Sequence, residues 1–136
     1  VVAHDPDLVV WQVGSNAVLR GVGLSDAEKH LREGIELITQ HNIDVVLMGM
    51  QFAPVIVHHE GHLGMRRLIS SVAQELKIPV FDRFGLMRSW QNEADDEWLD
   101  KSLHPDGLHM TSTSYRCLAS ALAKFLSSHA QQKPTQ

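Results

Sequence analysis

The chain has 136 residues, of which 43% are hydrophobic and 21% are charged, and its formal net charge is −4 at pH 7. This length and composition predict one globular domain, placed over residues 1–128 with a polar tail at 129–136, and exclude a disordered chain. The acidic balance argues against a nucleic-acid partner, and no apolar run is long enough for a membrane span. One cysteine, Cys117, excludes an internal disulfide framework, and we expect it to be buried and inert.

Three apolar runs rich in β-branched residues predict strands at residues 8–13, 43–48 and 78–81. The first run does not alternate with polar residues, which is typical of a strand covered on both faces. Pro79 cannot donate to a strand ladder, so the third strand should lie at a sheet edge. Strands that alternate with helices predict right-handed βαβ units, hence a parallel sheet with helices on both faces.

Four helices are expected from apolar residues at helical spacing. The first begins in a capping box, in which the Ser25 hydroxyl and the Glu28 carboxylate satisfy free N–H groups, and Asn42 closes it. The second carries its apolar stripe from Met65 to Leu76, and a short third helix covers residues 84–91. The last is capped by Thr111 or Ser112 and should turn these residues inward: Tyr115, Leu118, Leu122, Phe125 and Leu126.

A Gly-Ser-Asn motif follows the first predicted strand directly, at residues 14–16. Ligands of open α/β sheets bind outside the carboxyl ends of the strands. Gly14 allows a tight turn there, and the Asn16 amide offers N–H donors for a developing oxyanion. The same three residues are also common in ordinary turns, which leaves a purely structural role open.

An Asp-Gly-Leu-His motif lies before the last predicted helix. Asp106 and His109 are three residues apart, so one tight turn brings the carboxylate to the imidazole. The carboxylate would fix the ring tautomer and leave the other ring nitrogen free to accept a proton. The alternative is a capping aspartate beside an exposed histidine.

Together the two motifs resemble the third and fifth sequence blocks of the SGNH hydrolases, also called GDSL-type esterases and lipases. Residues 6–16 resemble the third block, and residues 106–110 followed by Tyr115 resemble the fifth. The resemblance covers essentially the whole chain, as the C-terminal two thirds of such an enzyme. It implies an α/β, three-layer, flavodoxin-like fold with a parallel sheet, incomplete at the N-terminus.

The resemblance also implies a carboxylic ester hydrolase that forms an acyl-enzyme on a serine. His109 would be its general base, Asp106 would orient the imidazole, and Asn16 with Gly14 would form the oxyanion hole. Short-chain acyl or acetyl esters, including acetylated carbohydrates, would be the substrates, and no metal or other cofactor is required. The family slightly favours an exported protein, without fixing the compartment.

The Gly-Asp-Ser block that carries the nucleophile in this family is absent from the chain, and the second-block glycine has no counterpart. We therefore expect the nucleophile upstream of Val1, on the protein's own N-terminal segment as a second polypeptide, and no activity from these 136 residues alone. Ala17 stands where many members have Asp. Serines considered as internal substitutes are Ser15, Ser112, Ser114 and Ser25 in the stretch 23–27, which nearly spells a nucleophile elbow.

Two further features stay open at the sequence level. Gln51, Phe52 and Pro54 leave the second strand at the same edge and either line the substrate pocket or form a structural turn. A dense cluster of possible ligands, His58, His59, Glu60 and His62, suggests a metal-binding domain as an alternative, although the spacing is not that of a zinc protease. A third possibility is a non-catalytic binding or assembly module that uses an exposed side of the sheet as its interface.

Overall fold

The structure, a computed structural model, describes residues 1–93 and 101–130. The chain forms two compact units, residues 1–87 and 88–136. A 3₁₀ turn, Val2–His4, precedes the first strand. Within the described ranges, no helix has the length and apolar character needed to cross a membrane.

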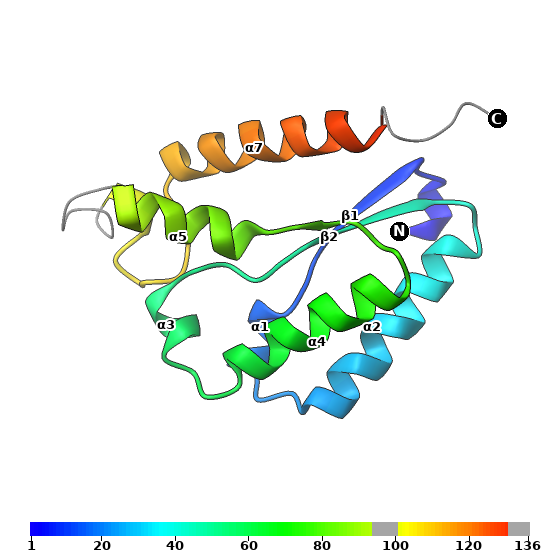
Figure 1. Cartoon of the computed structure of the whole chain (residues 1–136), viewed down its shortest axis with the longest axis horizontal. Helices are drawn as coiled ribbons and strands as arrows, with labels where there is room; N and C mark the ends of the chain where they lie inside the picture. The colour runs from blue at the N-terminus through cyan, green and yellow to red at the C-terminus, as the bar shows by residue number, and fades with distance from the viewer. Residues whose placement is uncertain (94–100, 131–136) are drawn as a thin grey trace. The chain divides into compact units, whose positions relative to one another are not determined.

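The first unit is built on a three-stranded parallel sheet in the order β1-β2-β3, formed by Leu8–Gln12, Asp44–Met48 and Val80–Phe81 (Figure 1). This confirms the predicted parallel strands and, within the described sheet, the edge position of the third. The Pro79 carbonyl still accepts a hydrogen bond from the backbone N–H of Leu47 at 2.9 Å. Proline thus joins the ladder as an acceptor only.

The first strand is less covered than its sequence predicts. Leu8 and Val10 lie on the same face of β1 and are 38% and 37% exposed, whereas Val45, Val46 and Leu47 of β2 are buried. The expectation of a first strand covered on both faces is therefore wrong for the described chain. The reason is position, because β1 forms the edge opposite β3, and an apolar run alone does not distinguish an edge strand from a central one.

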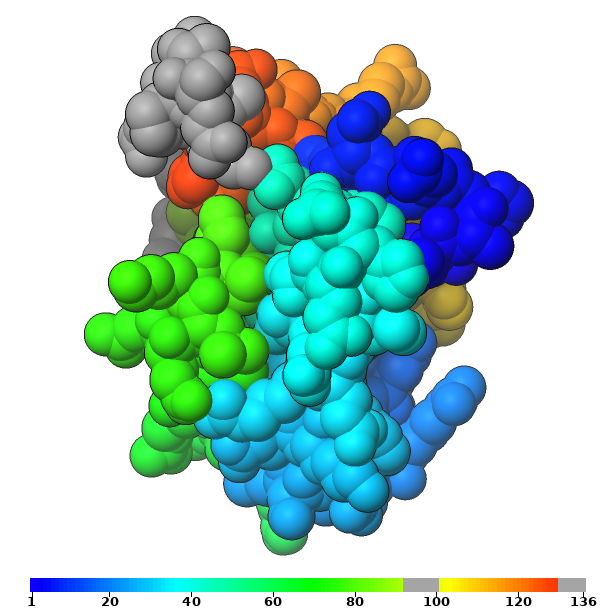
Figure 2. Space-filling model, turned by 90° about the vertical axis from the view of Figure 1, so that its right-hand side faces the viewer, coloured from blue at the N-terminus to red at the C-terminus, as the bar shows by residue number. Residues whose placement is uncertain are grey.

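Two long helices, α2 (Leu24–Thr39) and α4 (His62–Glu75), pack side by side on one face of this sheet (Figures 1 and 2). Each buries an apolar stripe at helical spacing, made of Leu31, Ile35 and Ile38 in α2 and of Met65, Ile69, Val72 and Ala73 in α4. Arg32 joins the two helices, since its guanidinium donates to both carboxylate oxygens of Glu75 at 3.0 and 2.6 Å.

A glycine in the middle of α2 makes room for an aromatic ring. A methyl group at Gly34 would overlap the six-membered ring of Trp11 on β1. Glycine inside a helix costs about 1 kcal/mol relative to alanine. That cost is offset here by the close packing of helix backbone on the indole.

The start and end of α2 differ from the prediction. The helix begins at Leu24, after an extended Gly23, and Ser25 makes no side-chain capping bond, so the predicted capping box is wrong. The helix ends at Thr39, before Asn42, which adopts a left-handed conformation with φ 58°. Asparagine tolerates this region better than most residues, so Asn42 turns the chain into β2 instead of capping the helix.

Helix α5 (Arg83–Glu93) contains the predicted short helix. It runs from the first unit into the second, and Asp82 caps its start, because the Asp82 carboxylate accepts the Gly85 N–H at 2.9 Å. Two very short helices, α1 (Ser15–Leu19) and α3 (Pro54–Val57), follow β1 and β2.

The second unit contains helix α7 (Ser112–Ala130), whose cap is Thr111, with its hydroxyl accepting the Ser114 N–H at 3.3 Å. Leu118 is buried, but Tyr115 is 49% exposed and Cys117 is exposed, so the predictions of an inward Tyr115 and a buried Cys117 are wrong. The buried side of the helix contains Ser114 and Leu118. Tyr115 follows Ser114 and Cys117 precedes Leu118, and one step along a helix turns a side chain by about 100°, so both point away from the buried side.

Leu122, Phe125 and Leu126, the other three residues expected inward, are half-buried. The helix includes the first two residues of the expected tail, 129 and 130, and the other six, 131–136, lie outside the described residues.

Candidate active site

The Asp106–His109 motif forms a tight loop in the second unit. An isolated antiparallel bridge between Leu103 and Met110 closes the loop, and the His104 N–H donates to the His109 carbonyl at 2.7 Å. Gly107, at φ 65°, takes the left-handed position that the turn requires. The loop therefore holds its central residues through backbone bonds that are local in sequence.

Inside this loop, the Nδ1 of His109 lies 2.6 Å from the Oδ2 of Asp106. The Oδ1 of Asp106 accepts two backbone N–H groups, from Leu108 and His109, each at 2.9 Å. These bonds, the one from the imidazole first, lower the pKa of Asp106 to about 2. Asp106 is thus an ionised acceptor at neutral pH and favours the His109 tautomer that carries its proton on Nδ1.

The second ring nitrogen of His109 is available for chemistry. Its side chain is 67% exposed, and within residues 1–93 and 101–130 no group hydrogen-bonds to Nε2. With the proton held on Nδ1, Nε2 presents a lone pair to solvent. This is the arrangement that a general base needs.

The Gly-Ser-Asn motif lies in the first unit and links the ends of β1 and β2. Gly14 has φ 94°, and a methyl group there would come within 2.5 Å of Met50 Cγ and 2.7 Å of Ile69 Cδ1. Only glycine fits this position without displacement of its neighbours. Ser15 is buried, and its hydroxyl accepts the Gln51 N–H at 3.2 Å, which fixes the loop to the segment after β2.

Asn16 occupies the first turn of α1 and is exposed. Together with Gly14 it lines a pocket of about 280 Å³, which Trp11, Arg20 and His30 also border. In the part of the chain that the structure describes, the Asn16 amide and the Gly14 N–H donate to no protein group. Both donors are free to meet a negatively charged oxygen.

The three predicted pocket residues after β2 take different environments. Gln51 is buried, Phe52 packs edge-to-face on Phe84 with ring centroids 5.1 Å apart, and Pro54 is the first residue of α3. None of them lines the 280 Å³ pocket or a second pocket of about 440 Å³ at the ends of β2 and β3. Their contact with a substrate stays a prediction.

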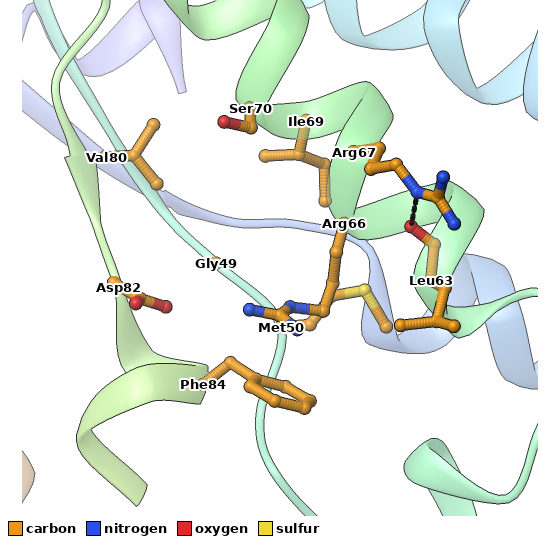
Figure 3. A pocket seen from close by; sticks show the side chains of 10 residues that line it. All are labelled: Gly49, Met50, Leu63, Arg66, Arg67, Ile69, Ser70, Val80, Asp82 and Phe84. Carbon is orange, nitrogen blue, oxygen red and sulfur yellow. Dashed lines mark hydrogen bonds between the residues drawn. The ribbon is translucent and has the colours of Figure 1, made fainter. Parts of the chain in front are cut away.

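A second pocket, of about 440 Å³, lies at the carboxyl ends of β2 and β3, against α4 (Figure 3). The residues that line it are Gly49, Met50, Leu63, Arg66, Arg67, Ile69, Ser70, Val80, Asp82 and Phe84. None of these residues is predicted from the sequence as a site residue. The one signal in the sequence was the adjacent Arg66-Arg67 pair on a helix that is otherwise amphipathic.

The histidine cluster is held by local hydrogen bonds. His59 accepts the Gly61 N–H at Nδ1, and the Nδ1 of His62 lies 2.8 Å from the His59 carbonyl. His58 follows α3 as its C-cap, whereas His62 begins α4. Across the described ranges, with their gap at 94–100, no three His, Cys, Asp or Glu side chains are grouped to hold a metal ion.

The chain is similar to a known protein family over nearly its whole length. The family model described as the Non-GDSL lipase-like family matches residues 1–132. No curated protein matches the sequence.

Solved structures share the fold over nearly the full chain. The lipase/acylhydrolase from Enterococcus faecalis is 21% identical with a TM-score of 0.75, over 100% of this chain and 68% of that one. A catalytic mutant of an acetylxylan esterase from Geobacillus stearothermophilus is 22% identical with a TM-score of 0.67, over 91% and 61%. A protein from Bacteroides fragilis described as an acylhydrolase is 22% identical with a TM-score of 0.70, over 95% and 65%. The chain thus has the α/β fold of these hydrolases and spans about 65% of the length of the last one.

Proposed function

The chain belongs to the Non-GDSL lipase-like family, and from this premise we propose that it supplies the general base and the oxyanion donors of a serine ester hydrolase. The observation that carries the proposal is the 2.6 Å contact between Asp106 and His109, with Nε2 of the imidazole open to solvent. This pairing matches the role that a carboxylate and an imidazole share in serine hydrolases.

In the proposed reaction, Nε2 of His109 removes the proton from a serine hydroxyl as the serine oxygen attacks the ester carbonyl. The tetrahedral intermediate collapses with loss of the alcohol, which receives the same proton from His109, and an acyl-enzyme remains. Water then attacks the acyl-enzyme by the same route and releases the acid. Asp106 stays ionised throughout and stabilises the imidazolium.

The oxyanion donors we propose are the Asn16 amide and the Gly14 N–H. Both have free hydrogen-bonding capacity in the described structure, and both border one pocket. Met50 and Ile69 pack so closely on Gly14 that no side chain fits there, and this packing restrains the backbone that carries the Gly14 N–H. Donors held in place in advance stabilise a developing charge without a reorganisation cost.

We place the nucleophilic serine outside this chain, on a segment N-terminal to Val1. Two of the internal candidates are engaged: Ser15 is buried and accepts the Gln51 N–H, and Ser114 is buried beside the Thr111 hydroxyl. No serine of the described ranges hydrogen-bonds to His109. In this proposal the N-terminal segment is a partner of the chain and completes its catalytic machinery.

The proposed substrates are short-chain acyl or acetyl esters, on small molecules or carbohydrates. Support comes from the family and from a relative of known activity, since one structure with the same fold is an acetylxylan esterase. The reaction needs no metal, and an exported location fits such substrates.

A second candidate is a non-catalytic binding module, and the exposed apolar residues Leu8 and Val10 on edge strand β1 favour it. An open strand edge with an apolar face readily takes a partner. The two candidates differ in turnover, because a binding module hydrolyses no ester in any assembly.

The test compares p-nitrophenyl acetate and p-nitrophenyl butyrate hydrolysis by the 136-residue chain with that of a polypeptide extended N-terminal to Val1. The proposal expects turnover from the extended protein and none above background from the 136-residue chain. Turnover by the verified 136-residue chain would place the nucleophile inside it. No turnover from either form would favour the binding module.

A further inference from the structure

The second pocket carries an unusual arrangement of charges. Arg66 extends from α4 over the ring of Phe84, with its guanidinium carbon 3.7 Å from the ring centroid (Figure 3). Arg67 and Ser70 line the same pocket from α4, and the Asp82 carboxylate lines it from the end of β3. The lining therefore holds two guanidinium groups and one carboxylate, which leaves a formal excess of one positive charge.

The Arg66 guanidinium is positioned by the Phe84 ring, and no carboxylate of the described residues neutralises it. Stacking on Phe84 occupies a face of the guanidinium and leaves the N–H donors at its edge available. Among the residues that the structure describes, no carboxylate forms an ion pair with Arg66 and no acceptor takes a hydrogen bond from it. Arg67 uses only Nε, in a 3.4 Å contact with the Leu63 carbonyl.

Asp82 faces Arg66 across the pocket without forming an ion pair with it (Figure 3). Its Oδ1 accepts the Gly85 N–H, which holds the carboxylate in place as the cap of α5. Space therefore separates two fixed opposite charges that could otherwise have paired. A ligand that fills this space would accept from the guanidinium and could donate to the Asp82 carboxylate.

The remaining walls favour an organic ligand over an inorganic ion. Leu63, Met50 and the ring of Phe84 form an apolar side, and the volume of about 440 Å³ is within the range of small-molecule sites. The position outside the carboxyl ends of β2 and β3 is where open α/β sheets bind their ligands.

We propose that this pocket binds an organic carboxylate, with Arg66 as the main anion contact and Phe84 and Leu63 against the hydrocarbon part. The pocket takes the carboxylate through the planar fork of donors that matches two carboxylate oxygens. Asp82 adds selectivity for ligands that also carry a hydroxyl donor. This assignment goes beyond the proposed esterase reaction, because it concerns equilibrium binding and involves neither His109 nor Asn16.

The experiment is a calorimetric titration of the purified chain with 4-hydroxybenzoate, with 4-hydroxybenzamide as the uncharged isostere and inorganic phosphate as the competing anion. The proposal expects 4-hydroxybenzoate to bind and the amide to bind at least about tenfold more weakly, because a charged partner strengthens the hydrogen bond. Equal binding of acid and amide would reduce the site to an apolar cavity. The absence of 4-hydroxybenzoate binding would overturn the proposal.

Variants assign the binding to this pocket. Arg66→Gln should weaken 4-hydroxybenzoate by about tenfold or more, and Arg66→Lys should recover part of the loss because it restores charge without the fork. Arg88→Gln is the matched control, since Arg88 is an exposed arginine of α5 that lines neither pocket, and it should bind as the parent does. Circular dichroism of each variant establishes that it is folded.

The competing anion separates a carboxylate site from a phosphate site. Phosphate that binds more tightly than 4-hydroxybenzoate and is lost with Arg66→Gln would overturn the carboxylate assignment in favour of a phosphate ligand. Equal weakening by Arg66→Gln and Arg88→Gln would show a general charge effect and also contradict the proposal. Since no step uses ester hydrolysis, failure here leaves the esterase proposal untouched, and the reverse holds as well.

Discussion

The Nδ1 of His109 and the Oδ2 of Asp106 lie 2.6 Å apart, in a loop that also directs the backbone N–H of His109 at the same carboxylate. One aspartate thus fixes both the imidazole and the chain that carries it. These two hydrogen bonds keep the imidazole oriented, although the His109 side chain is largely exposed. The proposed chemistry depends on it.

The first prediction concerns the general base. In the polypeptide extended N-terminal to Val1, His109→Ala should lower kcat on the order of 10⁴-fold or more, because no other group would accept the serine proton. His104→Ala is the matched control, since His104 is exposed in the same loop and contributes only backbone groups to the loop bonds, its N–H to the His109 carbonyl and its carbonyl to the Gly107 N–H. Steady-state hydrolysis of p-nitrophenyl acetate measures both. A similar loss in the two variants would mean that loop folding, and not the imidazole, controls the rate.

The second prediction concerns the tautomer. Asp106→Asn keeps an oxygen for the Leu108 and His109 N–H groups but presents an NH₂ group to the imidazole, which reverses the tautomer. We expect kcat to fall on the order of 10⁴-fold while the loop stays folded. The ¹⁵N shifts of His109 report the tautomer directly. An unchanged tautomer with unchanged rate would remove Asp106 from the mechanism.

The third prediction is the titration of Asp106, which should show a pKa of about 2, below the ordinary value of 3.8. Since the folded-state pKa is lowered, the Asp106 bonds stabilise the fold fully above pH 4, and this contribution is lost as the pH falls through about 2. Carboxyl ¹³C shifts recorded from about pH 1.5 to about pH 6 cover the window. In His109→Ala the pKa should rise towards its ordinary value, because the imidazole bond is the largest cause. A midpoint near 3.8 in the parent would show that the bond is absent in solution.

The fourth prediction concerns the oxyanion loop. Gly14→Ala should destabilise the chain by about 2–4 kcal/mol, because it combines a positive φ with a methyl group against Met50 and Ile69. Gly23→Ala is the control, since Gly23 has an extended backbone and open space around it, and should leave stability unchanged or raise it by up to about 1 kcal/mol. Urea unfolding compares them. Equal stability of the two variants would contradict the described packing of Gly14.

The fifth prediction asks whether Asn16 stabilises the oxyanion or only forms a turn. Asn16→Ala should lower kcat by about 10²–10³-fold with little change in KM, as expected for a donor that acts in the transition state. Stability should change little, because the Asn16 amide bonds to no protein group of the described residues. An unchanged kcat would make Asn16 a turn residue only.

Much of the fold and part of the site could be predicted from the sequence because the interactions are local. The parallel strands follow from apolar runs that end at turn residues, and the Asp106 contact with His109 needs only a three-residue turn. The expected capping box failed for a local reason as well. Gly23 takes the extended conformation, so the helix starts one residue before Ser25.

The second pocket could not be predicted from the sequence, because residues from separate segments form it: the ends of β2 and β3, helix α4 and the start of α5. Arg66 and Phe84 are far apart in the sequence, and the stacking of a guanidinium on a ring has no periodic signature. The prediction of an inward Tyr115 was wrong for another reason, because one position along a helix separates the buried Ser114 from the exposed Tyr115. Neither feature can be read from composition or spacing.

The central claim is that His109 serves a serine outside this chain, and covalent labelling tests it most directly. Purified protein containing the N-terminal segment is treated with a fluorophosphonate, and denaturing intact mass identifies the labelled polypeptide. The account predicts one adduct on the polypeptide that contains the residues before Val1, and its loss in His109→Ala but not in His104→Ala. An adduct on a serine of these 136 residues, or no adduct on any polypeptide, would contradict it.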